Sequence, residues 1–189
     1  PTISFNTPVK NAWIASVCAD SAGGASAVAD LFVKRGATSF GFIAGAVRSH
    51  ASKERLRGYR NALRKNGFTH IETATGGYHY DGGYRAVLSF HERGPMPGAI
   101  FCANDLMALG ALDALRSTLK LRVPEDVMVA RFDDVPEASW KSYGLTTIVQ
   151  DCRLMVADAM TALQSMMSAG SSAGGILRIV PCKLIERAT

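Results

Sequence analysis

The sequence predicts an α/β protein built on largely parallel sheets. Short apolar runs rich in β-forming residues alternate with longer segments of helical period, which is the pattern of βαβ units. The 189 residues are 48% hydrophobic, enough to bury a core. No apolar run approaches the roughly 20 residues that a membrane-spanning helix needs, so the composition indicates a globular protein.

The predicted strands are short and are bounded by polar or turn-forming residues. They cover Thr2–Phe5, Ser39–Ala44, His70–Ala74, Ala99–Ala103, Val127–Phe132 and Thr146–Val149. A further strand is expected to end near Cys18. After a turn at residues 171–175, two terminal strands, Ile176–Val180 and Lys183–Arg187, are separated by Pro181.

Between these strands, apolar residues recur every three or four positions, which predicts helices. The predicted helices cover Gly24–Lys34, Ser52–Lys65, Gly82–Arg93, Leu106–Thr118 and Cys152–Ser168. In the last of these, one face carries Val156, Met160, Leu163 and Met167. We expect that face to be buried in the core.

The cysteines indicate neither disulfides nor a metal site. Cys18, Cys102, Cys152 and Cys182 are far apart and form no C-x-x-C pair. They are typical of free thiols in a reducing cytoplasm, and no metal or cofactor is expected. The first residues carry no secretory signal, and because they begin within an apparent strand, the chain is interpreted as a fragment. The net charge of +5 comes from scattered Lys and Arg, as on a solvated surface.

Ligands of open α/β sheets bind beyond the carboxyl ends of the strands, so function is sought there. The segments that follow the predicted strands are mostly polar or aromatic: Gly45 to Ser52, Gly76 to Asp81, Asn104-Asp105, Asp133-Asp134 and Gln150-Asp151. None of them is a Gly-x-Gly-x-x-Gly or Walker-type loop. This pattern argues against nucleotide binding.

From Phe40 to Gln150, the order of motifs resembles the lactose-repressor/galactose-repressor family of transcriptional regulators. The resemblance rests on Ala99–Leu112 (AIFCANDLMALGAL), Leu121–Val127 (LRVPEDV), Phe132-Asp133-Asp134 and Leu145–Gln150 (LTTIVQ). It implies a periplasmic-binding-protein-like fold, in which crossing strands join two Rossmann-like or flavodoxin-like subdomains that close on a ligand in the cleft between them. The family also carries a helix-turn-helix module for operator DNA, which this segment lacks.

On this basis, residues 1–44 and 149–175 are expected to form an incomplete first subdomain. Residues 45–148 and 176–189 are expected to form the second. The implied function is sensing of a small, sugar-like effector by a cytoplasmic homodimer, which contacts operator DNA only through the missing module. The alternative is a periplasmic sugar-binding protein of an ABC transporter, which shares the fold and the pocket chemistry.

The predicted ligand contacts suit a sugar, which offers many hydroxyls and a flat C–H face. Arg55, Asn104, Asp133 and Gln150 can hydrogen-bond it, and Tyr78 can stack on it. Each matches a family position that contacts effector. Alternatives stay open: Asn104 and Asp133 could cap helices, and Arg55 could simply be solvated.

Less certain contacts are Ser49 and His50, which could belong to a flexible loop, and Asp20, which could cap the next helix. His79 and Tyr80 are secondary candidates. Asp105 is interpreted as a helix N-cap and Asp134 as a loop carboxylate. Two departures from the family pattern are Ala37 for a usual histidine and Arg131 for a usual glycine, and the second places a long charged side chain near the cleft.

An enzyme is not expected, because the sequence shows neither a nucleophile beside a base nor a metal cluster among its histidines. Dimerisation is predicted through the second subdomain, because the helix Leu106–Thr118 has more apolar surface than one sheet contact needs. The predicted interface residues are Leu106, Met107, Leu109, Gly110 and Asp113. The alternative is a helix buried on two sides within one subunit.

Overall fold

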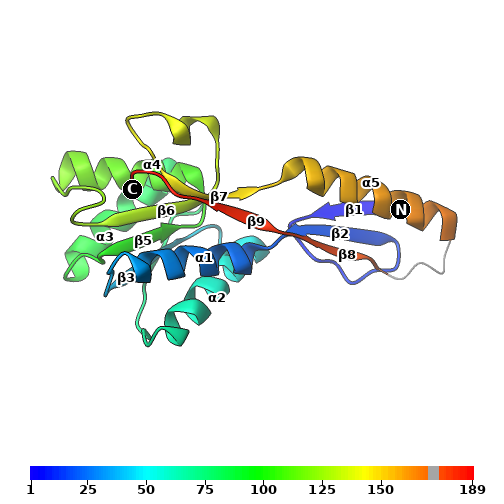
Figure 1. Cartoon of the computed structure of the whole chain (residues 1–189), viewed down its shortest axis with the longest axis horizontal. Coiled ribbons are helices and arrows are strands. Elements are labelled where there is room, and N and C mark those ends of the chain that lie inside the picture. Colours follow the sequence, from blue (N-terminus) through cyan, green and yellow to red (C-terminus); the bar gives the residue numbers. More distant parts are fainter. Residues whose placement is uncertain (170–174) are drawn as a thin grey trace.

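The computed structural model describes residues 1–169 and 175–189, apart from the side chains of residues 137, 138 and 169. Two parallel-stranded units lie end to end along the long axis of the molecule (Figure 1). The turn predicted at residues 171–175 lies outside the described residues except for Gly175. No helix within these ranges has the length and apolarity that crossing a membrane requires.

The larger unit contains a six-stranded sheet of order β4-β3-β5-β6-β7-β9. Its neighbours pair in parallel except β9, which runs antiparallel to β7. The strands are β3 (Phe40–Ala44), β4 (Glu72–Thr75), β5 (Ala99–Cys102), β6 (Met128–Asp133), β7 (Thr146–Gln150) and β9 (Cys182–Ile185). The central strands β3 and β5 are almost wholly buried and read as apolar runs, as expected for parallel strands that are covered on both faces.

Two pairs of helices cover this sheet: α1 (Ser21–Lys34) with α2 (His50–Lys65), and α3 (Tyr80–Arg93) with α4 (Asp105–Asp113), which continues into a π-helical turn at Ala114–Thr118. On β6, Phe132 lies against Gly24 of α1 and Arg131 against Asp105 of α4. Because neighbouring strand residues point to opposite faces, α1 and α4 lie on opposite faces of the sheet.

The smaller unit is a parallel three-stranded sheet of order β1-β2-β8, formed by β1 (Thr2–Phe5), β2 (Ile14–Ala19) and β8 (Leu177–Val180). Helix α5 (Cys152–Ala169) packs on it (Figure 1). The chain passes between the two sheets after β2, after β7 and between β8 and β9. The junction between the units is therefore made of these crossing segments.

The subdomain boundaries need correction. The helix α1 and the strand β3 were expected in the first subdomain, within residues 1–44, but both belong to the larger unit. The strand β8, expected in the second subdomain, pairs with β2 in the smaller sheet. A crossing takes only a residue or two of extended chain, such as Pro181 between β8 and β9, so no linker composition marks it.

The face that α5 buries was also predicted wrongly. Val156, Met160 and Met167 are more than half exposed. The buried stripe is one position earlier along the helix and consists of Met155, Ala159, Ala162 and Met166. Both stripes recur at helical spacing. The stripe of Val156, Met160 and Met167 was predicted to be buried because its side chains are larger. The small alanines of the other stripe allow close packing on β2.

Candidate ligand-binding site

The polar residues at the strand ends converge on the junction between the two units. Asp133 ends β6, Gln150 ends β7, and Asn104 follows β5 directly. Because these strands are parallel, their carboxyl ends all face the smaller sheet (Figure 1). The strand-end rule thus places the predicted contacts at one edge of the larger sheet.

A chain of side-chain hydrogen bonds crosses this junction. The Oδ1 atom of Asp133 accepts from Arg55 Nη2 at 3.3 Å and from Gln150 Nε2 at 2.5 Å. Gln150 Oε1 in turn accepts from Asn6 Nδ2 at 3.0 Å. Because Asn6 follows β1 of the smaller sheet, the series Arg55–Asp133–Gln150–Asn6 links the two units directly.

Arg55 is buried, which settles the open question of its exposure. Its side chain is 4% exposed, its Nη1 donates to the carbonyl of Ala103, and its guanidinium lies 3.7 Å from the centre of the Phe132 ring. Burial lowers the pKa of Arg55, and the nearby Asp133 carboxylate opposes that change. Burial likewise raises the pKa of Asp133, opposed by Arg55. Each charge therefore depends on the other for its compensation.

Tyr78 and Ser49 form a second polar group beside this chain. Their hydroxyls are 2.6 Å apart. Tyr78 has a φ of 71°, and its ring packs on the backbone of Gly45, where an added Cβ would lie 2.1 Å from the ring. Ser49 also caps α2 by accepting from Ser52 N at 3.2 Å. The loops after β3 and β4 are thus locked together at the site.

Asn104 is the N-cap of α4. Its Oδ1 accepts from Met107 N at 3.1 Å, and its Nδ2 reaches the carbonyl of Tyr78 at 3.4 Å. The capping alternative is therefore observed for Asn104. Asp105, interpreted from the sequence as the cap, is instead the first helical residue and is buried against Arg131, because its carboxylate compensates that guanidinium.

Asp20 caps α1 by accepting from Gly23 N at 2.8 Å. It also lines a pocket of about 340 Å³ between the two units, together with His50, Asn6 and Glu54. The two less certain contacts, Asp20 and His50, therefore lie together. By contrast, Tyr80 donates to Asp113 at 2.6 Å on the outer surface, away from this pocket.

Asn6 is a residue of the site that was not predicted from the sequence. Its Oδ1 accepts from Ala19 N at 2.9 Å and its φ is 53°, a conformation that asparagine adopts more readily than most residues. Asn6 follows the strand Thr2–Phe5 directly, so the strand-end rule that selected Asn104 could have found it.

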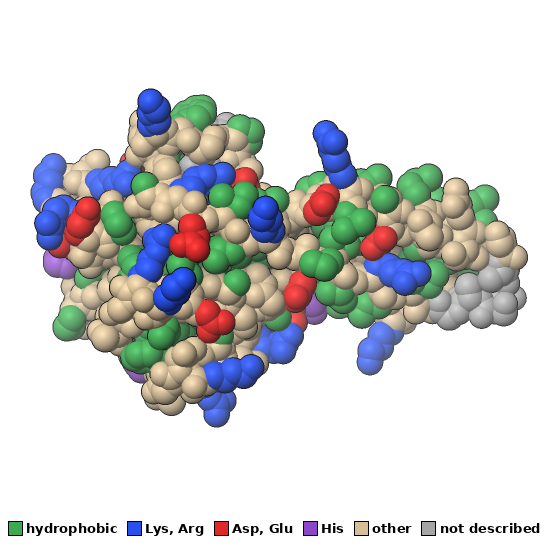
Figure 2. Space-filling view, viewed as in Figure 1, with side chains coloured by type: hydrophobic (Ala, Val, Ile, Leu, Met, Phe, Trp, Pro, Cys, Tyr) green, Lys and Arg blue, Asp and Glu red, His purple; other side chains and the backbone are tan. Residues whose placement is uncertain are grey.

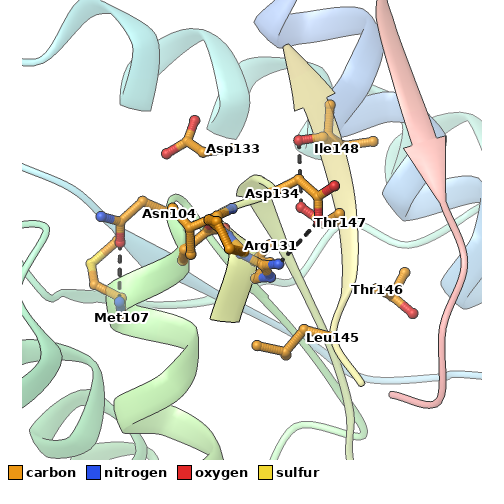
Figure 3. A network of polar contacts seen from close by, with 12 residues as sticks. Asn104, Met107, Arg131, Asp133, Asp134, Leu145, Thr146, Thr147 and Ile148 are labelled. Atoms are coloured by element: carbon orange, nitrogen blue, oxygen red, sulfur yellow. Dashed lines mark hydrogen bonds and ion pairs between the residues drawn. The ribbon is translucent and has the colours of Figure 1, made fainter. Parts of the chain in front are cut away.

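Arg131, expected near the cleft-facing end of its strand, has its side chain turned away from the cleft. It is wholly buried and forms an ion pair with Asp105. Figure 3 shows it beside Asp134, whose Oδ1 lies 3.4 Å away. The same Oδ1 accepts from Arg187 Nη1 at 2.7 Å. Strand alternation turns it toward α4, because Phe132 beside it faces α1. Asp134 is thus a member of an ion network and more than a loop carboxylate.

The predicted interface helix α4 is largely enclosed within the subunit. Met107 is wholly buried, and an added Cβ on Gly110 would lie 2.0 Å from the carbonyl oxygen of Tyr80 on α3. Asp113 accepts a hydrogen bond from the Tyr80 hydroxyl, and Leu109 is half-buried. Met107 and Gly110 are thus corrected to core residues, because α3 packs over them. Leu106 is the exposed member of the set, at 49%. Figure 2 shows apolar and charged side chains interspersed on the face of the molecule in view.

Among residues 1–169 and 175–189, no three His, Cys, Asp or Glu side chains gather as a metal ion would require. Cys102 is buried beside Arg131 and Asp105, and burial raises the pKa of its thiol well above the ordinary value. Burial also raises the pKa of Cys182, which lies near Arg55 and Asp133, to about 11. Neither thiol is therefore activated as a nucleophile.

Comparison with known proteins identifies the family. Residues 29–189 match the family described as periplasmic binding protein-like domain. The transcriptional regulator CelR of Thermobifida fusca is 36% identical over 149 residues, which are 78% of this chain and 44% of CelR. The lactose operon repressor of Escherichia coli is 30% identical over 157 residues, or 83% of this chain and 43% of the repressor.

A solved structure of a CelR–cellobiose complex superposes with a TM-score of 0.88 at 29% identity, covering 100% of this chain and 58% of that one. The chain therefore spans only about half the length of the relatives it matches. Sequence and fold lead to the same conclusion: the chain belongs to the periplasmic-binding-protein-like family, as the effector-binding region of the lactose-repressor/galactose-repressor regulators.

Proposed function

We propose that this chain is the effector-sensing unit of a cytoplasmic bacterial transcriptional regulator, and that it binds an uncharged, hydroxyl-rich molecule such as a sugar between its two units. The observation that carries the proposal is the hydrogen-bonded series Arg55–Asp133–Gln150–Asn6, which links both units through Gln150 at the end of β7. A ligand that bonds to Asp133 or Gln150 competes with these links. Its binding energy therefore acts on the relative placement of the units.

This placement provides the route to regulation. An effector controls a distant module only if it binds one arrangement of the protein more tightly than another. A DNA-binding module joined to the smaller unit would move with that unit whenever the orientation of the smaller unit relative to the larger one changed. The relatives named above are transcriptional regulators, which supports this role over that of a transport protein or an enzyme.

The charges at the site favour an uncharged ligand. Arg55 is paired with Asp133, and Arg57 at the pocket is paired with Glu54 at 2.6 Å. Asp20 adds a further carboxylate to the pocket lining. A phosphate or carboxylate on the ligand would thus meet arginines that are already compensated. Cellobiose, the sugar in the CelR complex, is such an uncharged molecule.

A thermal-shift panel tests the ligand class with matched pairs: glucose against glucose 6-phosphate, galactose against galacturonate, and cellobiose against cellobionate. A ligand present at 100 times its dissociation constant stabilises the native state by about 2.7 kcal/mol, which raises the melting temperature by roughly 5–10 °C. We expect shifts from uncharged members only. Shifts confined to anions, or no shift from any uncharged member, would contradict the proposed ligand class.

Asp133→Ala should weaken binding of the strongest sugar by about 2–4 kcal/mol, because the variant removes the carboxylate that accepts ligand hydroxyls and leaves its partners unpaired. Asp126→Ala is the matched control, since Asp126 is also paired with an arginine, at 2.5 Å, but far from the site. Isothermal titration calorimetry measures both. Equal affinity of the two variants for the sugar would show that Asp133 does not belong to the binding site.

We also propose that the chain forms a two-fold dimer through the exposed end of α4, where Leu106 is 49% exposed. Trp140, in the loop whose Val135 amide donates to Asp105 at the start of α4, is a second exposed apolar side chain, at 56%. Light scattering at micromolar concentration should report twice the chain mass, and Leu106→Asp should shift it toward the monomer. A monomeric parent chain would refute the dimer without affecting the ligand site.

A further inference from the structure

The turn that carries Asp133 has an unusual backbone. Asp133 has a φ of 114° and Asp134 a φ of 65°, so two successive residues other than glycine lie in the left-handed region. Such conformations cost energy and persist only when the surroundings hold them in place. The direction of the Asp133 carboxylate therefore depends on whatever secures this turn.

A buried ion network lies directly behind the turn. Arg131, in the strand that leads into it, pairs with Asp105 at the start of α4 and reaches Asp134 Oδ1 at 3.4 Å (Figure 3). Asp105 Oδ2 accepts from Val135 N at 2.5 Å. Arg187, from the C-terminal segment, donates to Asp134 Oδ1 at 2.7 Å. Polar contacts therefore hold the turn in place both before and after Asp133 and Asp134.

The network is balanced in charge, since Arg131 and Arg187 face Asp105 and Asp134. Balance of this kind is what allows full burial of a guanidinium, because an uncompensated buried charge is strongly destabilising. Arginine also differs from lysine here: its planar fork can contact two carboxylates at once, whereas an ammonium group is a single point charge. The bridge between α4 and the turn therefore needs arginine in particular.

We propose that Arg131 is a positioning residue of the effector site, which holds the Asp133–Val135 turn against α4 and so directs the Asp133 carboxylate toward Arg55 and Gln150. The role in ligand binding rests on the proposed function of Asp133, but the positioning itself does not. The competing explanation is that Arg131 merely compensates Asp105 and supports the fold. A lysine would still supply that compensation, so the two explanations predict different results for the same variant.

The test is amide hydrogen exchange, measured by NMR on the 189-residue chain without effector. Arg131→Lys should leave the melting temperature within a few degrees of the parent while exchange at the Val135 amide rises about tenfold, because the turn opens locally. Amides of the central strand β5 should keep the parent's rates. Arg122→Lys is the control, since Arg122 is paired with Asp126 at 2.5 Å on the exposed surface.

A second variant guards against loss of the fold. Arg131→Met combined with Asp105→Asn removes both buried charges, yet keeps a side-chain oxygen that can accept from the Val135 amide. Val135 exchange should rise in this variant too. The proposal is overturned if Val135 exchange stays at the parent's rate in both variants, or if exchange rises equally throughout the chain.

Effector binding separates this inference from the proposed function. If sugars bind the parent, Arg131→Lys should weaken that binding about tenfold without touching the ligand directly, since a misdirected carboxylate loses a charge-assisted hydrogen bond. Unchanged affinity together with faster Val135 exchange would overturn the role of Arg131 in ligand binding. Faster exchange in a chain that binds no sugar would count against the proposed ligand alone.

Discussion

Replacing Arg55 with methionine is the most direct test of the charge pair at the centre of the site. The substitution keeps an unbranched side chain of similar length but removes the guanidinium. That group contacts Asp133, the Ala103 carbonyl and the face of the Phe132 ring, and the residue is 4% exposed. Arg55→Met therefore removes every polar contact of a buried cation in one step.

The magnitude follows from these contacts. Breaking a buried ion pair by removing one partner costs about 3–5 kcal/mol. The Asp133 side chain is 33% exposed, so water can solvate the carboxylate left behind, and the lower end of that range applies. We expect a loss of about 3 kcal/mol, which corresponds to a fall of roughly 6–12 °C in melting temperature for a chain of this size.

Arg57→Met is the matched control, on the same helix. Arg57 is also paired, with Glu54 at 2.6 Å, but its side chain is 57% exposed, so its loss should cost about 0–1 kcal/mol. Urea unfolding of both variants and of the parent gives the two differences. If Arg55→Met costs no more than Arg57→Met, the pair with Asp133 makes no energetic contribution and the reasoning about the site fails.

Three further predictions test the packing and one surface pair. A Cβ at Gly58 would lie 2.1 Å from the α1 backbone, so Gly58→Ala should separate α1 from α2 and cost about 1–3 kcal/mol in urea unfolding, unlike an alanine at an open position. On α5, Met166→Lys should destabilise by several kcal/mol because Met166 is 3% exposed, whereas Met160→Lys, at a residue 53% exposed, should be tolerated; equal melting temperatures would refute the buried face. The hydrogen bond to Asp113 raises the pKa of Tyr80 to about 12, so the stability it contributes is complete below pH 10 and is lost as the pH rises toward 12. Asp113→Asn should lower the pKa of Tyr80, measured as the difference in phenolate absorbance between the variant and the parent across the titration, and identical titrations would contradict the pairing.

Local sequence signals determined much of the fold. The alternation of apolar runs with helical segments predicted the α/β class, and most elements of the larger sheet lie within a few residues of their expected bounds. Asn104, Asp133 and Gln150 could be assigned to one edge because parallel strands end together, a rule that needs only the order of strands and helices.

Tertiary structure alone decided the remaining features. Whether Arg55 is solvated or buried depends on the Phe132 ring and the Ala103 carbonyl, which are distant in sequence. The same is true of α5, where the Met155 and Met160 stripes are equally periodic and only the sheet selects one.

Tertiary structure also decided the subdomain boundary and the direction of the Arg131 side chain. Periodicity reports how a segment folds locally, so it locates strands such as β3 and β8 but not the sheet that each one joins. A charged residue in a strand was expected near the cleft, because sequence alone does not reveal a compensating carboxylate. Asp105 supplies that carboxylate from a helix beside the strand, and this long-range pairing allows Arg131 to be buried.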